Sequence, residues 1–333
     1  MLDCSQKIYG FSLEISQDSA IIIVISRTFI EVVPMKKMLF IMNPYAGMRK
    51  ANRYLADIIS IFNRVDYEVT TYMTAAPGDC IHAVSQRVKD VDLVVCAGGD
   101  GTFNETVTGI LRSGIDVPVG YIPAGSTNDF ATSLKLPTNI LDAARLIVEG
   151  EPVPYDVGRF NDRFFTYVAS FGAFTKASYS TPQNAKNALG HTAYLLSGIQ
   201  ELSQIRKTRV KLELDENTVI EDDFIFGAIS NSTSMGGILT LDPKQVDMQD
   251  GKFELFLVRA PRDLLELSEC VKALAEQKYN CKVITFRSAS KITVTASANT
   301  NWTLDGELEP GRETIQVENL QHAIRLISRR QNL

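Results

Sequence analysis

The octapeptide Gly98-Gly-Asp-Gly-Thr-Phe-Asn-Glu105 constrains the fold of this chain more than any other segment, because it follows the apolar run Asp92-Leu-Val-Val-Cys96. Its three glycines remove side chains where backbone must approach a phosphate, and a helix starting near Thr102 would turn unpaired N–H groups toward an anion. Asp100 is better suited to orient Mg²⁺ or its waters, or to accept a proton, than to touch phosphate. The segment predicts a strand, a glycine turn and a helix that bind a phosphate, although such turns often only pack.

Residues 38–150 alternate short apolar runs with amphipathic stretches. Apolar runs at 39–42, 92–96 and 117–122 predict buried strands, 67–72 predicts a further strand, and the apolar spacing over 50–64 and 81–88 predicts helices. This order indicates βαβ units, and therefore an α/β domain with a Rossmann-like parallel sheet. Ligands of such sheets bind beyond the carboxyl ends of the strands, which is where residues 43–47 and 98–102 fall.

The pattern changes after Pro152 and Pro154. β-branched and aromatic residues gather in short runs at 164–169, 209–214, 224–229, 253–258, 291–295 and 314–317, with helical stretches at 183–205 and 264–277. These runs predict a mainly antiparallel second domain, a β-sandwich or a barrel, of which we favour the sandwich. We therefore divide the chain into an extension at 1–37, an α/β domain at 38–152 and a β-rich domain at 153–317, with 318–333 packing back on the α/β domain.

Three interpretations of the first 34 residues stay open. The apolar run Ala20-Ile-Ile-Ile-Val-Ile25 is far shorter than the roughly 20 residues that a membrane span needs. Acidic residues occupy the place of the basic start of a signal peptide. The segment is a leader ahead of a start at Met35, an added strand or a weak membrane anchor. We favour the leader, because Met35-Lys-Lys-Met precedes the first buried run.

Composition excludes several classes of protein. A net charge of -5 and a pI near 5.4 give no global reason to expect nucleic-acid binding. The cysteines are scattered and lack a CxxC pair, which argues for a reduced, cytoplasmic compartment and against a disulfide framework or a zinc site. The P-loop pattern and the protein-kinase motif set do not occur in the sequence, so Walker-type ATPases and protein kinases are excluded.

Three more segments stand where strands are expected to end. The amides of Asn43-Pro-Tyr-Ala-Gly47 can cap a phosphate or a ribose, or the segment can be a plain turn. Pro123-Ala-Gly-Ser-Thr-Asn-Asp-Phe130 crowds four polar side chains together, or it caps the next helix. Leu304-Asp-Gly-Glu307 carries two carboxylates that would face the same way on a strand, where they could hold a metal or act as a base. Taken alone, the last segment is more often a solvated turn.

Taken in their order along the chain, the four segments resemble the motifs of the diacylglycerol kinase catalytic domain family. This family also contains sphingosine kinases, ceramide kinases and bacterial lipid kinases. The resemblance runs from about residue 38 to residue 327. Within the family, the chain is similar in particular to the soluble bacterial diacylglycerol kinases. It implies an ATP-dependent lipid kinase in which 38–152 binds the nucleotide and 153–317 binds the lipid. The expected reaction converts diacylglycerol to phosphatidic acid, although the residues do not decide which lipid is accepted.

Carried over motif by motif, the resemblance implies a set of site residues. Glu307 matches the proton acceptor for the lipid hydroxyl, with Asp305 beside it and Asp100 as a third catalytic acid. ATP would be bound by Asn43, Pro44, Tyr45, Ala46, Gly47, Thr74, Gly98, Gly99, Asp100, Gly101, Thr102, Phe103, Asn104, Ser126 and Asp129.

The same resemblance implies Mg²⁺ as a second cofactor. Asp100, Asp129 and Asp156 match acidic positions that organise Mg²⁺ and water around the phosphates. A structural Mg²⁺ would be held by Asp247, Asp250 and the backbone oxygen of Lys252, because Mg²⁺ prefers a few oxygen ligands plus waters. An Asp-Gly hairpin turn explains the same segment equally well.

Two positions depart from the family pattern. Met48 and Thr132 stand where relatives tend to have a lysine and an arginine, so two cations that could pair with acidic groups or phosphate are missing. Arg49 and Lys50 could replace the first. The alternatives are an NAD kinase-like phosphotransferase, which shares the glycine turn, and a non-catalytic lipid- or nucleotide-binding protein of the same fold.

The expected partner is a lipid substrate that the chain meets peripherally at the membrane surface. A homodimer is expected from the bacterial relatives, and nucleic acid is not an expected partner. The basic run Arg206-Lys-Thr-Arg-Val-Lys211 could attract anionic headgroups, but such a run is more often a solvated strand edge.

Overall fold

The computed structural model describes residues 12–15, 21–24, 35–49, 51–172, 207–215, 218–235, 239–277, 279 and 281–329. The predicted helix at 183–205 lies outside them. Residues Met1–Met35 and Lys36–Leu333 are two separate compact units. In the first unit, β1 (Ser12–Ile15) pairs antiparallel with β2 (Ile21–Val24), so the apolar run near residue 20 contains a strand of a hairpin.

The second unit begins with a parallel sheet in the order β4-β3-β5-β6. Its strands are β3 (Lys36–Met42), β4 (Tyr67–Met73), β5 (Leu93–Gly98) and β6 (Pro118–Pro123). The helical segments among and after them are η1 (Ala46–Arg49), η2 (Ala51–Tyr54), α1 (Leu55–Asn63), α2 (Asp79–Arg87), η3 (Val88–Asp90), α3 (Asp100–Ser113), α4 (Asp129–Ser133) and α5 (Ile140–Glu149). The parallel sheet expected from the alternating pattern is confirmed.

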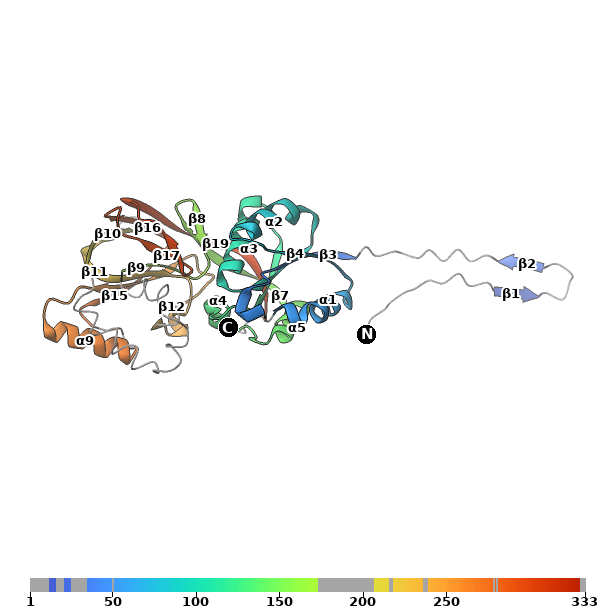
Figure 1. Cartoon of the computed structure of the whole chain (residues 1–333), viewed down its shortest axis with the longest axis horizontal. Helices are drawn as coiled ribbons and strands as arrows, with labels where there is room; N and C mark the ends of the chain where they lie inside the picture. Colours follow the sequence, from blue (N-terminus) through green and yellow to red (C-terminus); the bar gives the residue numbers. More distant parts are fainter. Residues whose placement is uncertain are drawn as a thin grey trace. The chain divides into compact units, whose positions relative to one another are not determined.

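Helices cover both faces of this sheet. In β3, Leu39 and Ile41 pack with residues of α2 and α3, whereas Met38, Phe40 and Met42 pack with residues of α1 and α5. Successive strand residues point to opposite faces, so a strand buried on both faces is read as one continuous apolar run. Figure 1 shows the two pairs of helices on opposite sides of the sheet.

Most of the remaining strands are antiparallel. They are β7 (Glu151–Phe160), β8 (Arg163–Phe165), β9 (Val168–Gly172), β10 (Thr208–Leu214), β11 (Thr218–Ser230), β12 (Ser234–Met235), β13 (Leu239–Thr240), β14 (Phe253–Arg259), β15 (Ile284–Ala289), β16 (Lys291–Ala296), β17 (Trp302–Leu304), β18 (Glu307–Glu309) and β19 (Thr314–Ser328). Two helical segments complete this part, η4 (Pro243–Gln245) and α9 (Leu264–Ala275), and α9 matches the predicted helix at 264–277. The antiparallel character of this part is confirmed, and the strands described form no closed barrel.

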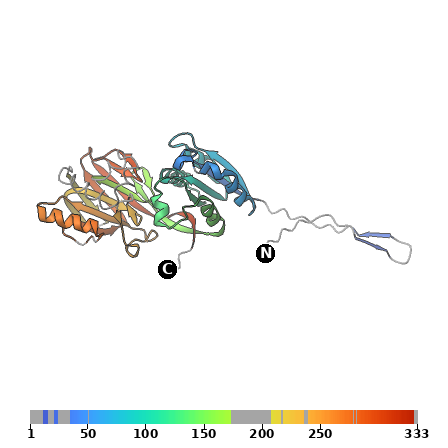
Figure 2. The same cartoon turned by 60° about the horizontal axis from the view of Figure 1, so that its bottom comes forward.

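Strand β19 joins the two parts into one sheet. It pairs antiparallel with β16 and β7, and near its end Arg325 and Leu326 lie opposite Pro118 and Val119 of β6 in parallel. The predicted strand at 314–317 is only the beginning of this 15-residue strand. The red C-terminal strand runs from the β-rich part into the α/β part (Figures 1 and 2).

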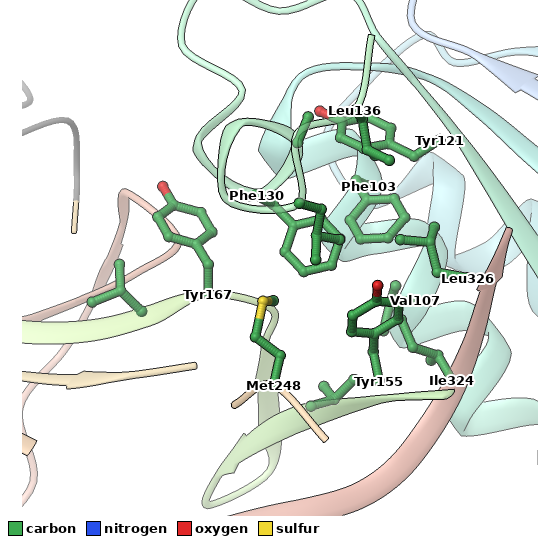
Figure 3. Close-up of a cluster of buried hydrophobic side chains, with 14 of the residues drawn as sticks. Phe103, Val107, Tyr121, Phe130, Leu136, Tyr155, Tyr167, Met248, Ile324 and Leu326 are labelled. Atoms are coloured by element: carbon green, nitrogen blue, oxygen red, sulfur yellow. The ribbon is translucent and has the colours of Figure 1, made fainter. Parts of the chain in front are cut away.

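An apolar cluster holds α3 against both parts. Phe103 of α3 stacks on Tyr121 and Phe130, with ring centroids 4.5 and 4.8 Å apart. Tyr155 of β7 and Leu326 of β19 belong to the same cluster (Figure 3). Stacked aromatic rings fix orientation as well as burying area. The cluster therefore fixes the start of α3, which carries the glycine turn, relative to the β-rich part.

Candidate functional site

Three turns meet at the carboxyl ends of β3, β5 and β6. The backbone N–H of Asn43 donates to Ala97 O (3.0 Å), and that of Ala124 donates to Gly98 O (2.8 Å). The turns after β3 and β6 are thus both hydrogen-bonded to the end of β5, which carries the glycine octapeptide. Asn43 Nδ2 also donates to Thr102 Oγ1 (3.3 Å) in the first turn of α3.

Close backbone approach explains the glycines of these turns. A Cβ built on Gly47 would lie 1.9 Å from Ala124 O, and Gly47 has a left-handed backbone with φ of 51°. A Cβ on Gly125 would lie 2.5 Å from Gly99 Cα. Both distances are shorter than real Cβ contacts. Only glycine fits at these positions without a shift of the neighbouring turn.

A cavity of about 370 Å³ opens beside these turns and includes one residue of the β-rich part. It is lined by Asn43, Tyr45, Ala46, Thr74, Ala75, Ala76, Pro77, Gly99, Gly101, Thr102, Glu105, Gly125 and Glu307. Seven of the predicted nucleotide-binding positions and the predicted proton acceptor therefore share one cavity.

The other predicted nucleotide-binding positions do not line the cavity: Pro44, Gly47, Gly98, Asp100, Phe103, Asn104, Ser126 and Asp129. Gly47 and Gly98 shape the turns. Phe103 is fully buried in the apolar cluster. Asn104 Nδ2 donates to Phe164 O (3.0 Å) and to Asp305 Oδ2 (2.7 Å), so it ties α3 to the β-rich part.

Of the loop after β4, sequence reasoning placed only Thr74 in the site, and it missed the two acidic residues that hold the loop. Ala75 N and Ala76 N donate to Asp79 Oδ2 (2.7 and 3.0 Å), and Gly78 N donates to Glu105 Oε1 (2.7 Å). Burial raises the pKa of Glu105. The only sequence signals were the Pro77-Gly78 break and the place of Glu105 at the end of the octapeptide.

Asp305 and Glu307 face different surroundings, so the expectation that both carboxylates face the same way is wrong. Asp305 and Gly306 have φ of 50° and 86° and form the turn between β17 and β18, where a continuous strand would have placed the carboxylates side by side. The side chain of Glu307 is 55% exposed and lines the cavity.

Asp305 is buried and builds the turn that carries Glu307. Its carboxylate accepts hydrogen bonds from Thr166 N, Thr166 Oγ1, Tyr167 N, Val168 N and Asn104 Nδ2, at 2.6 to 3.1 Å. Burial raises the pKa of Asp305, and the hydrogen bonds from the 166–168 segment oppose this shift. The predicted single strand at 164–169 is accordingly split into β8 and β9, because the N–H groups of residues 166 and 167 bind Asp305.

Asp100 caps the short helix α4. Its Oδ2 and Oδ1 accept from Asp129 N (3.1 Å) and Phe130 N (3.3 Å). Burial, followed by the neighbouring Asp129 carboxylate, raises the pKa of Asp100 to about 7. Asp129 Oδ1 in turn accepts from Ser234 Oγ (3.0 Å). A nearby cation would stabilise both carboxylates in their charged form.

The four predicted metal positions lie near one another, outside the cavity lining. Asp156 accepts from Gly251 N (2.7 Å) and His322 N (2.8 Å), while Asp247 and Asp250 accept from the N–H groups of Gln249 and Lys252 (both 2.9 Å). Lys252 O accepts from Asn319 Nδ2 (2.9 Å). In the described part of the chain, His, Cys, Asp and Glu side chains form no group of three or more that could hold a metal.

Glu254 and Asn319 were missed by sequence reasoning and adjoin these positions. Burial raises the pKa of Glu254 to about 8, and the carboxylates of Asp250, Asp247 and Asp156 add to the shift. Glu254 Oε2 and Asn319 Oδ1 are buried and have no hydrogen-bond partner among the residues described. Unpaired buried oxygens of this kind fit a neighbouring cation, because buried acceptors otherwise find a donor.

The positions that depart from the family pattern are described only in part. Thr132 Oγ1 donates to Asn128 O (2.9 Å) within α4. The side chains of Met48 and Arg49, and all of Lys50, lie outside the described structure. In the described part of the basic run, Arg209 pairs with Glu221 (3.0 Å) and Lys207 with Asp223 (3.6 Å), as expected of a strand surface.

Comparisons with known proteins agree with the motif order. Residues 37–160 match the model of the diacylglycerol kinase catalytic domain. The chain is 32% identical over 275 residues to the diacylglycerol kinase of Bacillus subtilis, a match that covers 82% of this chain and 90% of the relative. It is 32% identical to the diacylglycerol kinase of Staphylococcus haemolyticus over 80% of this chain and 81% of the relative.

A solved structure agrees as well. The crystal structure of a diacylglycerol kinase from Bacillus anthracis superposes with a TM-score of 0.73 and 25% sequence identity, covering 90% of this chain and 99% of that one. Extensive coverage on both sides means that the likeness includes the glycine turns and the β-rich part together. The chain therefore belongs to the diacylglycerol kinase family of enzymes.

Proposed function

We propose that this enzyme is an ATP-dependent lipid kinase that converts diacylglycerol to phosphatidic acid. The observation that carries the proposal is the single cavity shared by the glycine turns and Glu307. Turns with bare backbone amides suit the phosphates of a nucleotide, and the carboxylate of Glu307 in the same cavity suits a hydroxyl proton. The relatives reported above carry the name diacylglycerol kinase.

The proposed chemistry is a direct phosphoryl transfer. The lipid hydroxyl oxygen forms a bond to the γ-phosphorus of ATP, the bond from that phosphorus to the bridging oxygen breaks, and ADP leaves with the electron pair. Glu307 accepts the hydroxyl proton. Such a transfer depends mainly on positioning and on neutralising charge, so the enzyme needs an exact fit more than a strong base.

Mg²⁺ is proposed at two places in the chain. Asp100 in the glycine turn is half-buried and lies beside the buried Asp129, and a cation there would neutralise phosphate charge. The unpaired oxygens of Glu254 and Asn319, beside Asp247, Asp250 and Lys252 O, fit a structural ion. These residues would supply oxygen ligands and leave room for waters, as Mg²⁺ prefers.

The lipid substrate places the enzyme at a membrane surface. Within the described residues, helices that are both long and apolar enough to cross a bilayer are absent. We propose peripheral contact with the membrane, in which the enzyme takes its substrate from the lipid layer without spanning it.

The test is a kinase assay on lipid micelles with radiolabelled ATP, comparing wild type with Glu307→Ala and with Glu313→Ala as an exposed acidic control. We expect label in diacylglycerol for wild type and the control, and at least a 100-fold lower rate for Glu307→Ala with nucleotide binding kept. Transfer to NAD and not to lipid would refute the proposal. A panel with sphingosine and a polyprenol shows which hydroxyl is preferred.

The second candidate is a non-catalytic binding protein of the same fold. It is favoured by Met48 and by Thr132, whose hydroxyl is bonded within its own helix and supplies no charge. Binding of ATP without transfer to any lipid of the panel would support this candidate.

A further inference from the structure

One arginine contacts two glutamates beside the cavity. Glu307 and Glu309 are two residues apart on β18, so their side chains lie on the same face of the strand. Arg163 of β8 faces both of them. Its Nη1 lies 2.8 Å from Glu309 Oε2, and its Nη2 lies 3.4 Å from Glu307 Oε2. The guanidinium therefore joins the two carboxylates across the edge of the cavity.

The two contacts are unequal in a way that suggests different roles. The side chain of Glu309 is only 6% exposed, and its contact with Arg163 is a short, charge-assisted hydrogen bond. Bonds of this kind are strong and hold the planar guanidinium in one orientation. Glu307 is more than half exposed and its contact is longer. Glu309 thus anchors Arg163, and Arg163 is placed to orient the more exposed Glu307.

The glycine turn limits the position of the Glu307 side chain from the other side. A Cβ built on Gly101 would lie 3.1 Å from Glu307 Oε1. One carboxylate oxygen of Glu307 therefore rests against the start of α3, while the other faces Arg163. The third glycine of the octapeptide leaves room for this carboxylate, which a larger residue would push back toward Arg163.

The charge around the cavity gives such an orienting cation a role. Glu105 and Glu307 both line the cavity, and the charge of Glu307 contributes to raising the pKa of Glu105. Lysine and arginine are absent from the lining among the residues that the structure describes. Two like charges repel each other across the cavity, and a cation beside Glu307 opposes this repulsion.

We propose that Arg163 is a positioning residue for Glu307, held in place by Glu309, and that this pair aims the Glu307 carboxylate at the lipid hydroxyl. The inference rests on the proposed function, in which Glu307 accepts the hydroxyl proton. It assigns Arg163 no contact with ATP, because Arg163 does not line the cavity.

Steady-state kinetics of Arg163→Met, Arg163→Lys and Glu309→Gln test the proposal. We expect Arg163→Met to lower kcat about 10- to 100-fold while KM for ATP stays within about twofold, since misplacing a reacting group by about 1 Å has this effect. Arg163→Lys should recover part of the rate, because lysine keeps the positive charge but cannot bind two carboxylates through a planar guanidinium. Glu309→Gln should lower kcat as well, and adding it to Arg163→Met should cost no more than the single change, because both act on one unit.

The matched control is Arg159→Met, which removes an arginine of β7 that pairs with Glu318 of β19. We expect wild-type kinetics from this variant. A wild-type kcat in Arg163→Met, or a rise in KM for ATP without a change in kcat, would overturn the proposal while leaving the proposed function intact.

Hydrogen exchange of residues 304–309 separates the two hypotheses independently of activity. We expect faster amide exchange there in Arg163→Met and Glu309→Gln, and no change in Arg159→Met. Absence of lipid phosphorylation by wild type would refute the proposed function alone, whereas unchanged exchange in Arg163→Met would refute the role of Arg163.

Discussion

Replacing Gly47 by alanine tests whether the backbone contact between the first and third turns holds the nucleotide site together. The new Cβ would lie 1.9 Å from Ala124 O, and contacts below 3.0 Å are essentially never seen, so the two turns must separate by about 1 Å. The left-handed backbone of an L-residue costs about 1–2 kcal/mol, and forced overpacking costs about 1–3 kcal/mol more. We expect a total loss of about 2–5 kcal/mol in the free energy of unfolding.

Gly114→Ala is the control that isolates the clash. Gly114 ends α3 with a φ of 69°, and a Cβ there would meet nothing within 4 Å. The free energy of unfolding of this variant should fall only by the cost of the left-handed backbone, about 1–2 kcal/mol, and its activity should stay unchanged. Both variants remove the same glycine freedom from the unfolded chain, so their difference reports the native contact.

The assays are urea unfolding and titration of the transfer rate with ATP. Gly47→Ala should displace the first turn on the side that is proposed to face the nucleotide. The kcat/KM of this variant for ATP should therefore fall about 100-fold. Equal unfolding losses in Gly47→Ala and Gly114→Ala, together with an unchanged KM for ATP, would show that the two turns are not locked together and would refute the reasoning.

Three further outcomes are expected. Asp305→Asn should lower the free energy of unfolding by roughly 2–4 kcal/mol in urea, because its amide would face donors that now bind a carboxylate, whereas Asp162→Asn at the exposed end of an ion pair should change little. The folded-state pKa of Asp100, about 7, lies above its ordinary 3.8, so the folded protein binds this proton more tightly than the unfolded chain does. The contribution of Asp100 to the free energy of unfolding should therefore fall as pH rises from about 4 to 7. Asp100→Asn should flatten this slope in urea titrations across the same pH range. Mg²⁺ should raise the melting temperature of wild type at pH 8 more than that of Glu254→Gln, and an equal rise in both would remove Glu254 from the ion site.

The sequence predicted the α/β part well because three of its four strands, β3, β5 and β6, are buried on both faces. Leu39 to Met42 form one apolar run, and a run of this length between helices is typical of a strand buried on both faces. The three turns could be placed together for the same reason, since parallel strands bring their carboxyl ends to one edge. The order of the elements thus predicted where a ligand binds, whereas the roles of the site residues came from the family resemblance.

Side-chain orientation in the β-rich part could not be predicted in this way. The direction of Asp305 depends on a left-handed turn and on N–H donors 137 to 139 positions earlier in the chain, which leave no local pattern. Most of β19 was missed because charged residues such as Glu318 and Arg325 interrupt its apolar pattern, and its register shifts between Leu320 and Ile324. The link from Glu105 to Gly78 is likewise a contact between segments, and sequence spacing does not show it.

The shared strand β19 has a consequence for how the protein is made. Residues 314–328 provide the neighbour of β6 in one part and of β16 in the other, so neither part has all its strands until this segment has been synthesised. A nascent chain that stops before it leaves β6, β7 and β16 each with an open edge, and open strand edges are the surfaces through which chains aggregate. The sheet of both parts is thus completed late and together, when this segment has been made.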